Sequence, residues 1–497
     1  MSRVTSPTWW ILSAILFVFC AAAMAPLPGH TVADNHTSVH EFVEDQEQLI
    51  PELIKRYGIP GAALAMVHDG EIVWVEGYGV ADTETGRPVS SNTVFEAGSI
   101  AKSLTAWGVM RLVENGDVEL DAPVEQYLTR WAFPESEYPT EEITIRRLLS
   151  NSSGLPFVIH IPSIDGLLDG EFSDDQVTPE QRAGEGFIYS NPGWVILALM
   201  IEDVSGSTYP AFMREEVLEP LGMHDSGFGW SDEFAERIAV GHTFDGDPVA
   251  VDDHGPYGAG SLYTSADDLA RFLTASMPGA NGAPAGGDVL TPESVELLHT
   301  PQIEVSGVYH RLMSESYGLG HFVETLPNGH AGITHGGESS GWLTAYYAVP
   351  ETGNGLIFLT NSRRSWRMVS ILDEWAEWQD LSSTVMTRNY SRMETGVQLA
   401  IALFALGSIA NLGILLISSY RGTRRLAPLA SPQRVRRSIL GLLAVLLIGG
   451  WWISAYNLAG PFFPILSVYL GIAITTFGLT LIALAATPTI DREPTAG

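Results

Sequence analysis

Apolar and polar positions alternate with two different periods in the first part of the chain. Over residues 40–57 the apolar side chains recur at helical spacing, which predicts a helix with a kink or restart at Pro51. Two short apolar runs, 62–68 and 72–78, flank Asp69-Gly70, a dipeptide typical of a tight hairpin. The pattern therefore predicts a helix followed by two antiparallel strands.

The same two periods recur further along the chain. A second helix is expected over residues 99–115, and the polar stretch 160–186, rich in Gly and Asp, predicts a long loop. The runs 344–349 and 356–360 predict strands, and 365–381 predicts a closing helix. Since strands lie at both ends and helices lie between them, we expect an α+β domain whose sheet is closed by its two ends.

Three apolar runs near the C-terminus are long enough to span a bilayer, namely Val397–Ser419, Ile439–Ala459 and Ile465–Ala486. Six arginines and no acid lie between the first and second runs, so the positive-inside rule places that segment in the cytoplasm. We expect a multi-pass plasma-membrane protein with its main domain outside and a tail, 488–497, inside. The runs contain no Asp, Glu or Lys, which indicates an anchor in the lipid bilayer or a platform for an unknown membrane protein partner.

The N-terminus has the composition of a secretory signal. An apolar run from about Trp9 to Ala25 follows Arg3, and small residues near its end offer a cleavage site. We expect residues 1–33 to be a signal peptide or an N-terminal anchor. The only cysteine, Cys20, lies in this run, so an intramolecular disulfide and a cysteine-based metal site are excluded.

The distribution of charged residues adds information about the main domain. The 497 residues carry 58 acids and 26 bases, and 56 of the acids but only 19 of the bases precede residue 397. So acidic a domain repels phosphate backbones, which argues against nucleic acid as a partner. Only two bases are lysines, and such a halophile-like acidic surface is tolerated in a salt-rich setting because counterions screen self-repulsion. An ordinary acidic surface with GC-rich codon usage is the alternative.

The sharpest chemical signal is Ser99-Ile100-Ala101-Lys102. Residues three apart share one face of a helix, so the hydroxyl of Ser99 is expected beside the amine of Lys102. A serine hydroxyl is a weak nucleophile that needs a base, and a lysine with a lowered pKa can serve. The backbone N–H of Ser99, at the helix N-terminus, can bind an oxyanion. This spacing alone is more often a solvated pair.

Two further segments contain residue types that acyl transfer needs. In Tyr189-Ser190-Asn191, a phenol near a lysine ammonium has its pKa lowered and can move protons, while Asn191 can donate to a substrate carbonyl and contact the lysine. In His335-Gly336-Gly337, the glycines let a substrate backbone approach and free the N–H of Glu338 to face an oxyanion. Each segment alone is more often a structural turn.

Together, in this order and spacing, the three segments resemble the serine beta-lactamase and penicillin-binding family, specifically its branch of class C beta-lactamases, D-aminopeptidases and beta-lactamase-like esterases. The resemblance covers most of residues 55–361 and implies a transpeptidase-like antiparallel sheet flanked by helices, with a helical subdomain. The supporting stretches are Ile59-Pro60-Gly61-Ala62, Gly77-Tyr78-Gly79, Leu148-Leu149-Ser150-Asn151-Ser152-Ser153-Gly154-Leu155, Glu219-Pro220-Leu221-Gly222-Met223 and Gly258-Ala259-Gly260-Ser261-Leu262-Tyr263.

The resemblance also implies roles. Ser99 would be the acylated nucleophile, and Lys102 and Tyr189 would share the general base and acid role. No metal or cofactor is implied. The other implied site residues act in substrate binding or the proton relay (Asn191, His335 and Gly337) or supply the backbone N–H groups of the oxyanion hole (Ser99 and Glu338).

Two positions depart from the family pattern. His335 stands where lactamases have Lys, as in many non-lactamase members, which weakens the case for a beta-lactam carboxylate as ligand. Asn151-Ser152 stands where relatives often have His-Thr. The carboxylate of Glu338 would favour a substrate with a free amine.

A competing motif is Gly337-Glu338-Ser339-Ser340-Gly341, which matches the nucleophile elbow of α/β-hydrolases. That fold needs an acid and then a histidine after the serine, and the last histidine of this chain, His335, precedes it. We therefore reject this interpretation. The sequence has no phosphate loop, dinucleotide-binding glycine motif or His-Glu-x-x-His, so no nucleotide or metal cofactor is expected.

The sequence thus predicts a membrane-anchored extracytoplasmic serine hydrolase that cleaves an amide or ester bond of a small or peptide substrate through an acyl-serine. The hydrolase domain is expected over 36–385, a linker over 386–396 and the membrane region over 397–487. The layout also resembles the peptidases that mature colibactin-type prodrugs by removing an N-acyl-D-asparagine cap. A carboxypeptidase of cell-wall peptides and a catalytically silent scaffold of the same fold are further alternatives.

Overall fold

The computed structural model describes residues 38–158, 162–251, 255–307, 309–381, 383–424 and 434–488. The chain divides into an N-terminal unit, residues 36–389, and a C-terminal unit that contains residues 390–497. The expected signal segment 1–33 lies outside the described residues. So does the expected tail 488–497, apart from its first residue.

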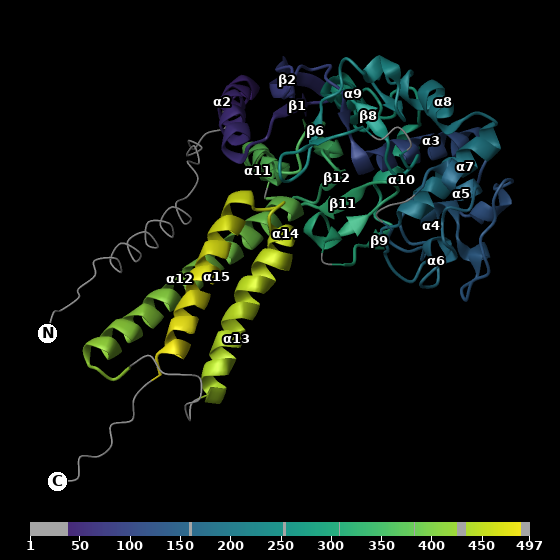
Figure 1. Cartoon of the computed structure of the whole chain (residues 1–497). Coiled ribbons are helices and arrows are strands. Elements are labelled where there is room, and N and C mark those ends of the chain that lie inside the picture. The colour runs from purple at the N-terminus through teal and green to yellow at the C-terminus, as the bar shows by residue number, and fades with distance from the viewer. Residues whose placement is uncertain are drawn as a thin grey trace, which may run out of the picture. The chain divides into compact units, whose positions relative to one another are not determined.

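The core of the N-terminal unit is an antiparallel sheet (Figure 1). Its strands are β1 (Gly61–His68), β2 (Glu71–Asp82), β3 (Arg87–Pro88), β9 (Ile303–Glu304), β10 (Ser316–Tyr317), β11 (Phe322–Thr325), β12 (Ala331–Glu338), β13 (Leu343–Val349) and β14 (Asn354–Thr360). Among the described residues the strand order is β3-β2-β1-β14-β13-β12-β11-β10-β9. Two smaller sheets are formed by β4 (Phe95–Glu96), β5 (Gly227–Phe228) and β8 (Leu262–Thr264), and by β6 (Gly241–His242) and β7 (Pro248–Val249).

The two ends of the unit meet in the large sheet, which confirms the predicted α+β fold with an antiparallel sheet. β1 pairs with β14, with Ala62 opposite Thr360 and Val67 opposite Gly355. On its other edge β1 pairs with β2 through the predicted hairpin at Asp69-Gly70, where both residues have positive φ. All but the last residue of β1 is buried, as are all residues of β13 and β14, so these strands lie in the core of the sheet.

Helices α2 (Val39–Tyr57) and α11 (Val369–Trp378) come from opposite ends of the unit and pack against each other (Figure 1). The Phe42 ring stacks on Trp378 with centroids 4.8 Å apart. Gln46 Nε2 donates a hydrogen bond to Glu374 Oε2 at 3.0 Å. The closing helix predicted over 365–381 is therefore α11, preceded by a 3₁₀ turn.

Pro51 lies inside α2, which continues through it, so of the kink or restart expected there the restart does not occur. Proline removes one backbone hydrogen bond from a helix. Leu49, Ile50 and Leu53 around it are buried, and burial of such side chains stabilises the helix enough to offset that loss.

Helix α9 (Ala266–Ala275) packs against the sheet, and the largely buried helices α3 (Ala101–Asn115) and α7 (Asn191–Ser205) pack against each other. Trp107 of α3 meets Phe272 of α9 edge-on at 5.3 Å. Nearly every residue in the first two thirds of α3 and α7 is buried, so these helices form the centre of the unit. The other helices are α4 (Ile145–Leu149), α5 (Ile164–Leu168), α6 (Asp174–Val177), α8 (Tyr209–Met213) and α10 (Pro292–His299).

The stretch 160–186, expected to be a loop throughout, contains the short helices α5 and α6. Ser163 accepts a hydrogen bond from Gly166 N at the start of α5, and Ser173 forms a capping box with Gln176 at the start of α6. Local capping by serine stabilises single helical turns that the apolar pattern does not reveal.

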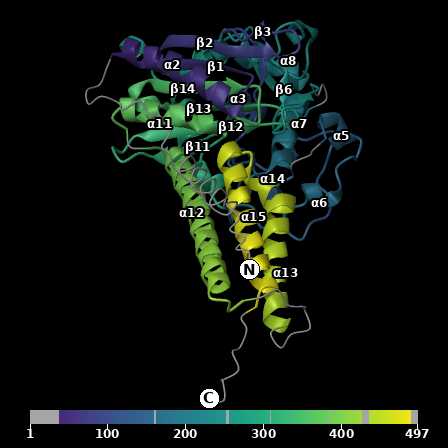
Figure 2. The ribbon, with the colours of Figure 1, turned by 60° about the vertical axis from the view of Figure 1, so that its left-hand side comes forward.

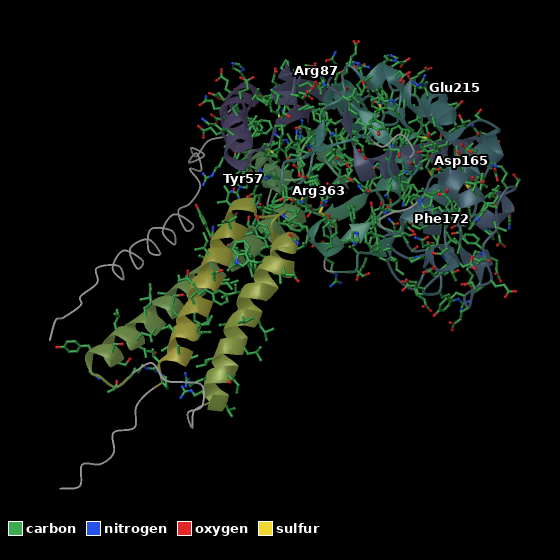
Figure 3. The ribbon with its side chains drawn as sticks, in the orientation of Figure 1. Tyr57, Arg87, Asp165, Phe172, Glu215 and Arg363 are labelled. Atoms are coloured by element: carbon green, nitrogen blue, oxygen red, sulfur yellow. The ribbon has the colours of Figure 1, made fainter. Side chains whose placement is uncertain are left out.

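In the part of the C-terminal unit that the structure describes, the α-helices are α12 (Val385–Tyr420, whose first turn belongs to the N-terminal unit), α13 (Arg434–Gly450), α14 (Tyr456–Ala459) and α15 (Pro464–Ala486). Three helical segments, 385–420, 435–455 and 464–486, are long and apolar enough to cross a membrane, in agreement with the three predicted spans. Figures 1 and 2 both show α12, α13 and α15 as neighbours. The side chains drawn along them in Figure 3 are mostly carbon.

Small and apolar residues hold these helices together. Gly407 of α12 faces the Phe477 ring of α15, and a Cβ at Gly407 would overlap that ring. Asn411 Nδ2 donates to Thr480 Oγ1 at 3.0 Å between the same two helices. Close approach at a glycine and an interhelical hydrogen bond are typical of helix pairs in lipid.

The first apolar helix begins earlier than predicted. Residues 386–396, expected to be a linker, are the first turns of α12. The segment contains helix-favouring Met, Arg and Glu and no proline, and its one glycine is Gly396. Helical propensity therefore continues from the N-terminal unit into the apolar run.

Substitution of Asn361 tests how the two ends of the N-terminal unit are joined in the sheet. Its fully buried side chain follows β14, accepts from Gly61 N at 2.8 Å and donates to Val80 O at 3.2 Å. Asn361→Ala leaves the buried N–H of Gly61 without this acceptor, so we expect the free energy of unfolding to fall by roughly 2 kcal/mol. Urea unfolding of the full chain in detergent measures the change. The exposed Asn328→Ala is the control, and equal losses in the two variants would contradict the assignment.

Candidate active site

Ser99 and Lys102 meet as their spacing predicted. Ser99 lies in a 3₁₀ turn, Gly98–Ile100, that leads into α3, and it is partly exposed. Lys102 Nζ lies 3.2 Å from Ser99 Oγ. Gly98, with φ of +54°, makes the sharp entry into this turn at a conformation that favours glycine.

Lys102 is completely buried, which is rare for a lysine. Its Nζ donates to Asn191 Oδ1 at 2.8 Å and to the carbonyl oxygen of Ala259 at 2.7 Å. Burial lowers the pKa of Lys102 well below its usual value. A neutral amine can give two N–H bonds to the two oxygens, which leaves its lone pair for the hydroxyl proton of Ser99.

Tyr189 lies beside this pair. Lys102 Nζ is 4.8 Å from the centre of its ring, and the Tyr189 hydroxyl is hydrogen-bonded to the Ser99 side chain. Burial raises the pKa of Tyr189, and the hydrogen bond to Ser99 opposes this only in part. The lowered phenol pKa that we expected is therefore wrong, because burial takes the phenolate out of water and disfavours the charged form.

Asn151 holds the segment that carries Tyr189. Its backbone has φ of +54°, a conformation that asparagine tolerates well. Its carbonyl oxygen accepts from Ile188 N at 2.9 Å, and its Oδ1 accepts from Ser190 N at 3.0 Å and Trp194 Nε1 at 3.2 Å. The departure from the family pattern at Asn151-Ser152 thus has a structural role that the sequence did not reveal.

Asn191 is the first residue of α7, and the Ser190 side chain caps this helix. Asn191 Oδ1 accepts from Lys102, and Nδ2 donates to Val158 O at 2.8 Å. The Asn191 amide thus contacts the lysine through its oxygen. The amide nitrogen of Asn191 carries two N–H groups, so the one that is not bonded to Val158 O can face a substrate carbonyl.

Gly337 brings β12 against the turn at Ser99. A Cβ at Gly337 would overlap the carbonyl oxygen of Ala97, and a Cβ at Gly98 would lie 3.0 Å from the backbone nitrogen of Glu338. Thr344 Oγ1 donates to the same Ala97 oxygen at 2.9 Å. The backbone of Glu338 is therefore beside that of Gly98 and Ser99, where two N–H groups can converge.

His335 is buried on β12 with a partner on each ring nitrogen. Nδ1 lies 2.8 Å from the carbonyl oxygen of Gly336, and Nε2 lies 3.3 Å from the Tyr317 hydroxyl. Burial, and to a smaller extent Lys102, lower the pKa of His335 to about 3. Because a carbonyl only accepts, we assign the proton to Nδ1, and the neutral ring then accepts from Tyr317. Tyr317 carried no signal in the sequence.

The side chain of Glu338 is already paired. It forms an ion pair with Arg363, labelled in Figure 3, and accepts from the Tyr309 hydroxyl at 3.1 Å. The expected attraction for a substrate amine is therefore weakened, because a guanidinium already neutralises this carboxylate.

Aromatic side chains surround Tyr189. The His310 ring stacks on it at 4.8 Å and 21°, and Phe322 of β11 lies nearly parallel to it at 6.3 Å. Phe157 meets Tyr189 edge-on at 6.3 Å and is 51% exposed, while Tyr309 is 42% exposed. Sequence reasoning missed these residues because no motif marks them. Phe157, Tyr309 and His310 lie outside the strands, and Phe322 lies in the short strand β11, which offers little periodic pattern.

The rejected motif at Gly337–Gly341 covers the end of β12 and the turn that leads to the antiparallel strand β13. β12 ends at Glu338 and β13 begins at Leu343, so Ser339 is in a strand-to-strand turn. A nucleophile elbow requires a turn from a strand into a helix. Geometry and residue order therefore agree in excluding this serine as an elbow nucleophile.

Comparisons with known proteins show the family to which this unit belongs. Residues 47–376 match the beta-lactamase family model. Penicillin-binding protein 4 of Amycolatopsis lactamdurans is 31% identical over 317 residues, 61% of this chain and 81% of that protein. Esterase EstB of Burkholderia gladioli is 27% identical over 271 residues, 46% of this chain and 68% of that protein.

A solved class C beta-lactamase has the same fold. It superposes with a TM-score of 0.56 at 22% identity, covering 66% of this chain and 94% of that chain. The family match spans the sheet, the buried helices and the Ser99, Lys102 and Tyr189 positions. The chain therefore belongs to the beta-lactamase family of serine hydrolases, which includes penicillin-binding proteins and esterases.

Proposed function

We propose that this protein is a serine hydrolase that cleaves an amide or ester bond through an acyl-serine intermediate. The observation that carries the proposal is the buried Lys102 amine 3.2 Å from Ser99 Oγ, held by two carbonyl oxygens. A base with a lowered pKa next to a partly exposed hydroxyl is the arrangement that activates a serine.

In the first step the Ser99 hydroxyl proton moves to the lone pair of Lys102, and Oγ forms a bond to the substrate carbonyl carbon. The resulting oxyanion accepts from the backbone N–H groups of Ser99 and Glu338. As the tetrahedral intermediate collapses, the bond to the leaving group breaks. The proton returns from Lys102, through the hydroxyl of Tyr189, to the leaving amine or alcohol.

In the second step a water molecule attacks the acyl-serine and gives its proton to the same base. The ester bond to Ser99 breaks, the carboxylic acid leaves, and the serine hydroxyl is restored. A protonated Tyr189, kept neutral by burial, donates a hydrogen bond in both steps without carrying charge.

We further propose that the substrate is uncharged and apolar next to the scissile bond. Burial lowers the pKa of Lys102 and of His335 and so disfavours their charged forms, and Arg363 is paired with Glu338. These three groups therefore offer little positive charge to a substrate carboxylate. The exposed rings of Phe157 and Tyr309 instead provide apolar contact area. This favours a simple ester or amide over a beta-lactam.

The proposed location is the outer face of the plasma membrane. The apolar helices α12, α13 and α15 have the length and composition of membrane spans. The arginines between the first and second spans favour a cytoplasmic position for that segment, and the catalytic unit is then on the opposite side.

Labelling of Ser99 tests the activity and the location together. A membrane-impermeant fluorophosphonate should add one adduct to the full-length protein on intact cells, because Ser99 is activated and outside. Ser99→Ala should take up no adduct in the intact-mass spectrum. A folded parent protein that stays unlabelled in lysed cells, in low and high salt, would support a silent scaffold. Labelling that occurs only after lysis would place Ser99 on the cytoplasmic side, opposite to the proposed topology.

The pH dependence of this labelling tests the base. Because burial lowers the pKa of Lys102, its amine becomes neutral well below pH 10.5, and the labelling rate should rise and level off there. Lys102→Arg keeps a charged group at that position and should lower the rate about 10²-fold or more. Lys55→Arg changes the only other lysine, which is exposed, and should have no effect. If Lys102→Arg left the pH profile of the labelling rate unchanged, Lys102 would not be the base.

Phe157→Ala tests the apolar contact. Removing a partly exposed ring that the substrate covers should raise KM for an aryl or long-chain acyl ester about tenfold. KM for the acetyl ester should stay within about twofold, since that acyl group is too short to reach the ring. Val73→Ala, an exposed apolar residue on β2, is the matched control. Equal changes for both esters would show that Phe157 does not select the acyl group.

A further inference from the structure

The buried carboxylate of Glu324 in β11 binds the first turn of α12. Glu324, 4% exposed, accepts from the backbone N–H of Val385 through Oε2 at 2.8 Å. Its Oε1 accepts from the Tyr347 hydroxyl of β13 at 2.8 Å. Thr384 caps the same helix by accepting from Thr387 N at 3.2 Å. A carboxylate at a helix N-terminus satisfies a free N–H and complements the helix dipole.

This contact is close to the active site along β11. Phe322 and Glu324 are two residues apart in the strand and therefore point to the same face. The Phe322 ring lies 5.3 Å from that of His335 and 6.3 Å from that of Tyr189. The face of β11 that holds the start of α12 thus also packs on two of the site's rings.

A second contact from the same turn reaches the residue next to His310. Asn389, one helical turn after Val385, donates from Nδ2 to the carbonyl oxygen of Arg311 at 3.1 Å. Arg311 follows His310 in the 3₁₀ turn His310–Leu312. The His310 ring is the one that stacks on Tyr189 at 4.8 Å.

The turn that carries His310 is tied to the sheet at its other end. Ser314 Oγ donates to Val323 O at 2.7 Å, in the strand that also carries Glu324. Val385 and Asn389 are four residues apart and therefore share one face of α12. That face contacts both β11 and the His310 turn, and α12 continues without a break to Tyr420 as the first apolar helix.

We propose that Glu324 and Asn389 are positioning residues through which the first turn of α12 holds His310 against Tyr189. The proposal rests on the proposed hydrolase function. The start of an apolar, membrane-type helix then helps to position the active site, and the reaction rate depends on the position of that first turn. The residues act on the geometry of the Tyr189 ring and have no contact with the substrate.

The test uses the full-length protein in detergent micelles and an ester substrate. Asn389→Asp keeps the shape of the side chain but removes the N–H donor, and we expect kcat to fall roughly fivefold, the size of one hydrogen bond, with KM within about twofold. Asn389→Gln retains a donor and should recover most of kcat. Thr395→Ala removes a side-chain hydrogen bond further along α12 and should leave kcat unchanged.

A double-mutant cycle with His310→Ala separates positioning from general destabilisation. If Asn389 acts through His310, adding Asn389→Asp to His310→Ala should change kcat by less than about twofold. A similar fivefold loss in both backgrounds, or no loss in either, would overturn the proposal. If Asn389→Asp lowers the unfolding midpoint, Glu324→Gln replaces it in the double-mutant cycle with His310→Ala. This variant keeps one acceptor oxygen at position 324.

The parent protein distinguishes failure of this proposal from failure of the proposed function. If the parent neither turns over the ester nor takes up a fluorophosphonate at Ser99, the hydrolase function is wrong. If the parent reacts and Asn389→Asp reacts equally fast, only the positioning role is wrong.

Discussion

The active site depends on the burial of one amine. Lys102 has no exposed surface, and its nitrogen is held by the side-chain oxygen of Asn191 and the backbone oxygen of Ala259. Taking an ammonium out of water is costly, so burial favours the neutral form, whose lone pair can accept the hydroxyl proton of Ser99. Helix α7, which begins at Asn191, and the turn that contains Ala259 hold this amine in its buried position.

The rest of the site follows from the same low-dielectric environment. His335 stays neutral between Gly336 and Tyr317, and Tyr189 stays protonated beneath aromatic rings. The guanidinium of Arg363 is held by Glu338. Such a site stabilises a developing oxyanion mainly through backbone N–H groups, and it gives a substrate carboxylate little attraction.

Much of the fold could be predicted because it depends on local pattern. The hairpin at Asp69-Gly70, the strands that close the sheet and the three apolar helices all agree with the structure. The differences lie where local signals compete with packing or capping. α2 continues through Pro51 because its neighbours are buried, serine caps create α5 and α6, and α12 begins at Val385, one residue before the expected linker.

The sequence by itself determined which groups are available for chemistry, because a Ser and a Lys three residues apart on a helix must lie together. Tertiary structure alone decided their ionisation, since the pKa of Lys102 or Tyr189 depends on burial by segments far away in the chain. It also decided which loop residues surround the site. Tyr317 and His310 have no motif and gain their roles only through partners brought near by the sheet.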